Sequence, residues 1–442
     1  MRLIALTFAL LAAACASPGS EPGPVASMPA PAPPPPPPGG ELAVTANTGG
    51  PQLNPAGNQQ VANPTEGGFR AYLGELRPRM LAAGIAPATW DSAMSGVSLN
   101  MKSIGLSSGA SGGMGRIWTY LERVDVLLPR GRTALAANRA ALDKAARETG
   151  VDAVAIASIW GNETSYGNVL GNFYVVEALA SLAYEGRRRA FFEEELLAAL
   201  TLLQEGLVTR EELTGSYAGA LGQVQFMPSN ILKLGRDGDG DGERDLRGSL
   251  HDAFLSCGNY LRHHGWRPGE PWLAEARLPA GFRWELAGPD IRMTAAEWDD
   301  LGVRAFDGRR LTAMVGAEAP VSVILPAGHR GVPLIAFENY RRFLDYNPSQ
   351  AYAIAVAHLA NRLAGAAGFA QGWPADQGGM SAAEMTELQS HLLARGYDLT
   401  AAGRFGDKTR RAVRAYQLSA GLPADGYPTG ALLNRLRNER VS

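Results

Sequence analysis

Cysteine is almost absent from this 442-residue chain, which contains only Cys15 and Cys257. Two cysteines cannot form a disulfide framework, and Cys257 follows an apolar stretch in which a small buried thiol is expected. The formal net charge is only −2, and no basic cluster carries interleaved aromatic residues, so nucleic acid is excluded as a partner. The six histidines show no metal-ligand spacing, which argues against a zinc site.

The N-terminal apolar run, from Leu3 to Ala14, is too short to span a bilayer, which takes about 20 residues. Its length fits the core of a signal peptide. Leu11 to Ala14 followed by Cys15 resembles the cleavage box of bacterial lipoproteins, although Ala12 stands where Leu is usual, so ordinary cleavage nearby is the alternative. We therefore expect a signal peptide over 1–15, a lipid on Cys15, and attachment to the periplasmic side of the outer membrane.

Residues 16–66 are mostly Pro, Gly, Ala and Asn, including the run Pro33–Pro38. Such a segment has too few apolar side chains to offset the entropy lost on ordering. We expect a disordered tether of about 50 residues, which as a coil spans ~40 Å.

Glu163 follows the nearly uncharged run from Val151 to Ile159. A carboxyl at the end of an apolar helix is partly removed from water, which raises its pKa and keeps a proton available near neutrality. That is the property a general acid needs. The alternative is an exposed glutamate in the last turn of a helix.

Two further segments occur in a fixed order after Glu163. The first is Gly215–Ser229 (GSYAGALGQVQFMPS) and the second is Tyr346–Val356 (YNPSQAYAIAV). Together with the Glu-Thr-Ser-Tyr-Gly segment at Glu163, they resemble the lytic murein transglycosylases of the membrane-bound lytic transglycosylase B family. The resemblance extends from Phe69 to Trp373.

This resemblance implies that the protein cleaves the bond from N-acetylmuramic acid to N-acetylglucosamine in peptidoglycan without water and leaves 1,6-anhydro ends. In that reaction Glu163 is the acid and then the base, and no cofactor takes part. The other residues that the resemblance places at the substrate are Ser216, Gln225, Tyr346, Asn347, Tyr352, Tyr120, Arg187 and Arg188. For Tyr120 a packing role, and for the two arginines a solvated turn, remain open alternatives.

Glycosidases usually pair an acid with a second carboxylate about 5–9.5 Å away. No such partner is evident here, since Glu177 belongs to a packed helix and Glu193, Glu194 and Glu195 are predicted to form a solvated helix face. The resemblance implies that the substrate assists instead, with its own N-acetyl group stabilising the positive anomeric carbon. A muramidase that uses water and a peptidoglycan-binding scaffold without activity are the alternatives.

Carboxylates alternate with glycines from Asp237 to Asp245, a pattern typical of a calcium loop. Asp237, Asp239 and Asp241 occupy the first three ligand positions, and Glu243 would offer its carbonyl. Gly248 replaces the closing glutamate, so Asp252 is the candidate that closes the site. We expect a structural Ca²⁺, or Na⁺ in its place, and the alternative is a solvated acidic turn.

Helical periodicity, for example over Leu135–Arg147 and Phe191–Gln204, predicts a mainly helical core. The family resemblance implies that this core is a lysozyme-like catalytic domain at 67–375. Short extended runs at Val321–Leu325 and Val332–Phe337 predict a small β subdomain within it. Residues 380–438 resemble the small three-helix peptidoglycan-binding domain, with its Asp425-Gly426 turn. We expect the protein to be a monomer whose partner is the peptidoglycan glycan strand.

Overall fold

The computed structural model describes residues 60–109 and 113–439. The expected signal peptide, Cys15 and the tether up to residue 59 lie outside these residues. In the first part of the chain the helices are α1 (Glu66–Ala82), α2 (Pro87–Met94), α3 (Met101–Gly109), α4 (Ile117–Ala137), α5 (Arg139–Thr149), α6 (Ala153–Thr164), α7 (Val175–Glu185), α8 (Arg189–Gln204), α9 (Pro228–Leu234) and α10 (Leu250–His263). After the sheet come α13 (Glu338–Tyr346) and α14 (Gln350–Leu363).

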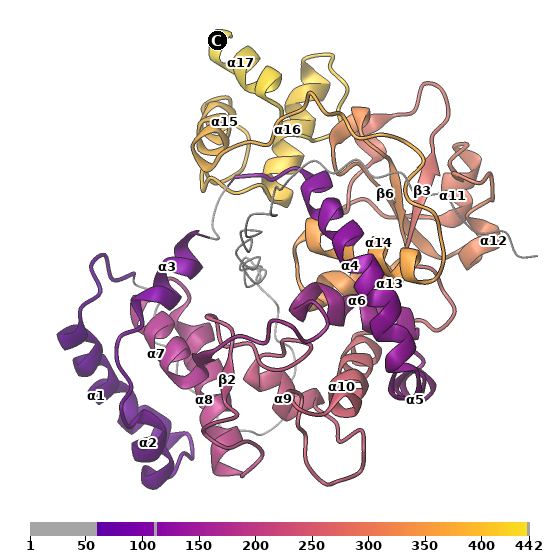
Figure 1. Ribbon diagram of the computed structural model, residues 1–442. Helices are drawn as coiled ribbons and strands as arrows, with labels where there is room; N and C mark the ends of the chain where they lie inside the picture. The colour runs from indigo at the N-terminus through magenta and orange to yellow at the C-terminus, as the bar shows by residue number, and fades with distance from the viewer. Residues whose placement is uncertain (1–59, 110–112, 440–442) are drawn as a thin grey trace, which may run out of the picture. The chain divides into compact units, whose positions relative to one another are not determined.

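Helix α6 is the centre of the helical core. It contacts α4, α5, α10 and α14, and Figure 1 shows α4, α6 and α14 side by side. Its residues from Ala155 to Thr164 are all buried, as expected for a helix that is apolar on every side. The first turn of α14 is fixed by Ser349, whose side chain accepts a hydrogen bond from the Tyr352 amide. These contacts place the end of α6 against the start of α14.

A two-stranded sheet joins β1 (Phe173–Tyr174) to β2 (Thr214–Gly215) within the helical part. A five-stranded antiparallel sheet has the order β4-β6-β7-β3-β5. Its strands are β3 (Leu273–Arg277), β4 (Met293–Thr294), β5 (Arg304–Ala305), β6 (Pro320–Ile324) and β7 (Leu334–Ala336), accompanied by the helices η1 (Trp284–Leu286), α11 (Ala295–Asp300), α12 (Thr312–Val315) and η2 (Gly328–Arg330). This sheet subdomain packs its own apolar core around Trp298.

The last segment contains α15 (Ala382–Ala394), α16 (Asp407–Ser419) and α17 (Gly430–Asn438). These helices, here called the C-terminal module, share a third apolar core that includes Leu388, Val413 and Leu436. Short backbone bridges join the module to the segment before α4. The amide of Gly113 donates to the Gly403 carbonyl at 2.6 Å, and Met114 and Met380 exchange hydrogen bonds of 2.7 and 2.9 Å.

The predicted fold class, a mainly helical lysozyme-like domain with a small β subdomain and a helical C-terminal domain, is confirmed. The strands expected near Val321 and Val332 form as β6 and β7. The helical periodicity over Leu135–Arg147 falls on the end of α4 and on α5, which meet at Asn138. No helix within 60–109 and 113–439 is long and apolar enough to cross a membrane.

Candidate active site

Glu163 lies in the last turn of α6 and is only 7% exposed. Burial raises the pKa of this carboxyl to about 7, against opposing effects of the Tyr352 hydroxyl and the Arg123 charge. The C-terminal end of a helix carries partial negative charge, which also disfavours an anion there. Glu163 is therefore a carboxylic acid that holds its proton near neutral pH.

The hydroxyl of Tyr352 donates to Oε1 of Glu163 at 2.6 Å. Tyr352 is 3% exposed and lies in the first turn of α14. Within the described part of the chain no hydrogen bond reaches Oε2 of Glu163. The contact leaves Oε2 as the oxygen that can exchange a proton with a substrate.

Arg123, on α4, completes the surroundings of the acid and was missed by the sequence reasoning. Its Nη2 donates to the Asn162 carbonyl at 2.8 Å, and its Nε is buried without a hydrogen-bond partner in the structure. Its positive charge lowers the pKa of Glu163. No sequence signal points to it, because its partner is a backbone carbonyl 39 residues further along the chain.

The end of α6 is tied to the Gly215–Ser229 segment through Gln223. The indole of Trp160 donates to Oε1 of Gln223 at 2.9 Å, and the Thr164 hydroxyl donates to the Gln223 carbonyl at 2.8 Å. Trp160 and Thr164 lie four residues apart on one face of α6, so both bonds fix the last turn of the helix to Gln223.

Three residues other than glycine have a positive φ in the described chain, and all three flank this site. They are Ser165 (52°), Tyr166 (61°) and Gln225 (52°). Side chains with a Cβ are disfavoured in this region, and such residues cluster at functional sites, where the surrounding contacts maintain the conformation. The backbone next to Glu163 and around Gln225 is thus fixed in an uncommon form.

The structure places the other residues expected from sequence at different points of the same region. The hydroxyl of Tyr346 donates to the Val224 carbonyl, and the charge of Glu163 contributes to raising the pKa of Tyr346. The amide of Gln225 donates to the Gly222 carbonyl at 2.9 Å, and the Ser216 hydroxyl accepts from the Ala220 amide at 3.0 Å. Asn347 is buried and accepts from the Ser349 amide. Tyr352 is therefore the expected residue that touches the acid, while the others shape the segments beside it.

The remaining expected substrate residues lie on other elements. Tyr120 is 42% exposed on α4, one turn before Arg123. Arg187 forms an ion pair with Glu185 at 2.6 Å, and the Arg188 guanidinium lies 4.0 Å from the centre of the Phe191 ring. Their contact with substrate stays a prediction.

No carboxylate in the described chain contributes to the pKa shift of Glu163. The prediction that Glu193, Glu194 and Glu195 form a solvated face is wrong for two of the three. Glu193 is 1% exposed and bonds Arg79 and Tyr72, and Glu195 is 5% exposed and accepts from the Ser229 hydroxyl at 2.7 Å. Burial of these carboxylates was hidden in the sequence because their partners lie far along the chain.

The acidic loop brings together Asp237, Asp239 and Asp252, whose carboxylate oxygens lie within 4.8 Å of one another. Asp252 reaches the loop from α10, as expected for a residue that closes the site. Asp241 is outside this group and accepts from the Glu243 amide. Three convergent oxygens fit a hard cation such as Ca²⁺.

Residues 68–361 match the family model described as the transglycosylase SLT domain. The chain belongs to the lytic transglycosylase family. A second model, described as a peptidoglycan binding domain, matches residues 381–436 of this transglycosylase. The family resemblance read from the sequence is thereby confirmed.

Solved structures agree with this assignment. The chain is 41% identical to SltB3 from Pseudomonas aeruginosa, solved in complex with NAG-anhNAM-pentapeptide, with a TM-score of 0.80 over 84% of this chain and 99% of that chain. It is 26% identical to the lytic transglycosylase Slt35 from Escherichia coli, solved in complex with calcium, with a TM-score of 0.57 over 72% of this chain and 98% of that chain.

A curated relative is the membrane-bound lytic murein transglycosylase B of Escherichia coli (strain K12), 37% identical over 149 residues. The match covers 32% of the transglycosylase and 41% of that relative. The chain thus aligns with less than half of the length of this relative.

Proposed function

We propose that the protein cleaves the bond from N-acetylmuramic acid to N-acetylglucosamine in peptidoglycan, with Glu163 as both acid and base, and forms 1,6-anhydro ends. The main support for this proposal is the buried carboxyl of Glu163, whose pKa is raised to about 7 without a contribution from any other carboxylate among the described residues. A pKa near the working pH suits a group that must first give and then take a proton.

In the first step, neutral Glu163 gives its proton from Oε2 to the bridging oxygen, and the bond from that oxygen to the anomeric carbon breaks. The N-acetyl group of the muramyl sugar stabilises the positive anomeric carbon. In the second step the 6-hydroxyl attacks this carbon and gives its proton to Glu163, which restores the acid. No water is consumed.

The residues around Glu163 have different roles in the two steps. Tyr352 holds Oε1, so the carboxyl keeps one orientation through both proton transfers. The Arg123 charge stabilises the carboxylate that exists between them. Burial raises the pKa of Glu163 and favours the neutral acid that starts the reaction, whereas the Arg123 charge lowers it. The two opposing effects leave a pKa at which Glu163 can both give and take a proton.

Mass spectrometry of fragments released from purified peptidoglycan tests this proposal. We would compare the wild type, Glu163→Gln and the control Glu75→Gln, which makes the same change at an exposed position on α1. We expect the wild type and the control to release products that are one water lighter than hydrolytic fragments. Glu163→Gln should release none.

Two other outcomes would contradict the proposal. Reducing ends would identify a muramidase, the alternative that cleaves the same bond with water. Binding of peptidoglycan without release of fragments by any of the three proteins would indicate a scaffold.

We further propose that Cys15 carries a lipid that attaches the protein to the periplasmic side of the outer membrane, with 16–66 as its tether and the C-terminal module as a peptidoglycan-binding domain. The name of the Escherichia coli relative, a membrane-bound enzyme, supports the attachment. Cys15→Ser is expected to move the protein from the membrane fraction to the soluble fraction. A soluble wild type would contradict the lipid anchor, and sedimentation of the detergent-solubilised protein would check the expected monomer.

We also propose that Asp237, Asp239 and Asp252 hold a structural Ca²⁺, or Na⁺, with Asp241 and the Glu243 carbonyl as further ligands. The convergence of three carboxylates supports this site. The calcium complex of the Escherichia coli relative is consistent with it. The ion would neutralise the repulsion among the carboxylates and hold the loop against α10, while the proton transfers of Glu163 need no metal.

A further inference from the structure

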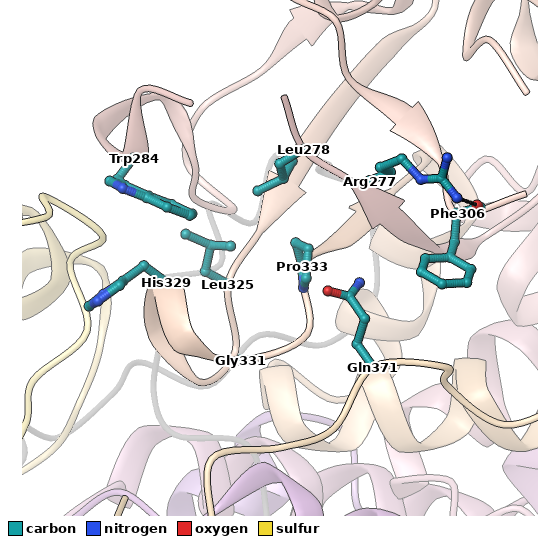
Figure 2. A pocket seen from close by; sticks show the side chains of 9 residues that line it. All are labelled: Arg277, Leu278, Trp284, Phe306, Leu325, His329, Gly331, Pro333 and Gln371. Carbon is teal, nitrogen blue, oxygen red and sulfur yellow. Dashed lines mark hydrogen bonds between the residues drawn. The ribbon is translucent and has the colours of Figure 1, made fainter. Parts of the chain in front are cut away.

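A cavity of about 210 Å³ lies in the sheet subdomain and shares no residue with the surroundings of Glu163 (Figure 2). It is formed where β3, β6 and η2 end, beside η1 and the segment that follows α14. The lining residues are Arg277, Leu278, Trp284, Phe306, Leu325, His329, Gly331, Pro333 and Gln371. The proposed reaction at Glu163 does not involve this cavity.

The aromatic rings of Trp284 and Phe306 lie at opposite ends of the cavity, with Leu325 and Pro333 between them (Figure 2). Phe306 is 37% exposed, so part of its ring is open to a ligand. An apolar floor with an aromatic ring at each end suits a flat ligand that has apolar C–H faces.

The polar side chains of the cavity are already held in position. Nη2 of Arg277 donates to the Phe306 carbonyl at 3.0 Å, and the guanidinium lies 5.5 Å from the Phe306 ring centre. The Gln371 amide donates to the Ala276 carbonyl at 3.2 Å, and its backbone amide donates to Glu275 at 2.9 Å. Side chains that are fixed beforehand lose less entropy when a ligand binds.

The end of the cavity at Trp284 is closed by His329. The two rings lie 5.6 Å apart, and Nδ1 of His329 is 2.6 Å from a carboxylate oxygen of Asp425 in the C-terminal module. The imidazole and the indole therefore form a rigid wall opposite Arg277 and Phe306.

The volume limits the ligand. Sites for drug-sized molecules measure about 300–1,000 Å³, so a cavity of about 210 Å³ takes one ring or a short side chain. In the part of the chain that the structure describes, only one hydrogen bond, from Nη2 to the Phe306 carbonyl, occupies the guanidinium of Arg277. A guanidinium has five N–H donors, so donors remain for the hydroxyl and acetamido oxygens of a neutral ring.

We propose that the cavity is a second carbohydrate site, which binds a single N-acetylated amino-sugar ring of a peptidoglycan strand away from Glu163. The apolar face of the ring packs between Trp284 and Phe306, and its hydroxyl and acetamido groups bond Arg277 and Gln371. The proposal depends on the proposed function only in taking peptidoglycan as the source of the sugar.

The test is a titration of the full-length protein in detergent, labelled with 5-fluorotryptophan, with free N-acetylglucosamine. The fluorine NMR signal of Trp284 is assigned by its loss in Trp284→Phe. Arg277→Met removes a lining side chain. Its matched control, Arg283→Met, makes the same change at an exposed arginine that pairs with Glu285 at 2.7 Å and lies outside the cavity.

We expect a saturable shift of the Trp284 signal in the wild type and in Arg283→Met. The affinity is expected to be about tenfold weaker in Arg277→Met and in a second variant, Gln371→Ala, because each loses a hydrogen-bonding partner. Thermal unfolding checks that both variants remain folded.

Three results would overturn the proposal. The Trp284 signal could stay unchanged while other tryptophan signals shift, which would place the sugar elsewhere. The affinity could be equal in the two arginine variants. A short peptide with a free carboxylate could shift Trp284 while the sugar does not, which would identify a peptide site. The titration involves no turnover, so none of these results bears on the reaction at Glu163.

Discussion

Glu163→Gln should stabilise the protein at alkaline pH while it abolishes the reaction. The pKa of Glu163 rises from an ordinary value of 4.5 to about 7 in the folded protein. Between these values the folded state binds more protons than the unfolded state, so the free energy of unfolding falls as pH rises. A difference of about 2.5 pKa units at 1.36 kcal/mol each corresponds to about 3 kcal/mol. Glutamine does not ionise, and the variant escapes this loss.

Denaturant unfolding of the full-length protein in detergent, at pH 4 and at pH 8, measures this difference. The gain of Glu163→Gln over the wild type should be small at pH 4 and about 3 kcal/mol at pH 8. Glu75→Gln, at an exposed position on α1, should follow the wild type at both pH values. An equal gain in the free energy of unfolding at the two pH values would contradict this prediction, since it would come from packing and not from the cost of ionising a buried acid.

The other predictions concern the neighbours of the acid and the acidic loop. Tyr352→Phe removes a hydrogen bond that lowers the pKa of Glu163, so the alkaline limb of kcat/KM should move up by about one pH unit. Tyr416→Phe, which loses a tyrosine-to-carboxylate bond of the same 2.6 Å length in the C-terminal module, should leave the limb in place; equal shifts would contradict the assignment. Arg123→Met should also move the alkaline limb of kcat/KM to higher pH. It should lower the free energy of unfolding by about 1–3 kcal/mol, because the Asn162 carbonyl loses its charged donor. An unchanged pH profile would contradict the role of Arg123. Calcium at 100 times its Kd should stabilise the chelator-treated protein by about 2.7 kcal/mol, seen as a higher Tm, and Asp252→Asn should remove this response; a wild type that ignores calcium would contradict the site.

Local pattern was sufficient for the fold class and for the position of the acid. The uncharged run before Glu163 predicted a buried helix end, and α6 is buried from Ala155 to Thr164. The alternation of Asp and Gly predicted a loop whose carboxylates converge, and Asp252 reaches it from the next helix. In these cases the deciding residues lie close together in sequence.

Contacts between distant residues could not be read in the same way. Glu193 and Glu195 look like a charged helix face, but Arg79, more than 100 residues earlier, and Ser229 provide buried partners for them. Arg123 meets Glu163 because α4 and α6 pack together, which no spacing within α4 reveals. Only the tertiary structure tells which charged side chains are satisfied inside the protein.

The backbone bridges at Gly113 and Met114 have a practical consequence for dissecting the protein. Truncation before residue 380 would leave three backbone groups without their present partners, at a cost of about 1 kcal/mol each. Gly113 and Met114 lie just before α4, the helix that carries Arg123. A shortened enzyme would therefore differ at its catalytic centre as well as in its hold on the cell wall, and slower turnover by it would not measure targeting alone.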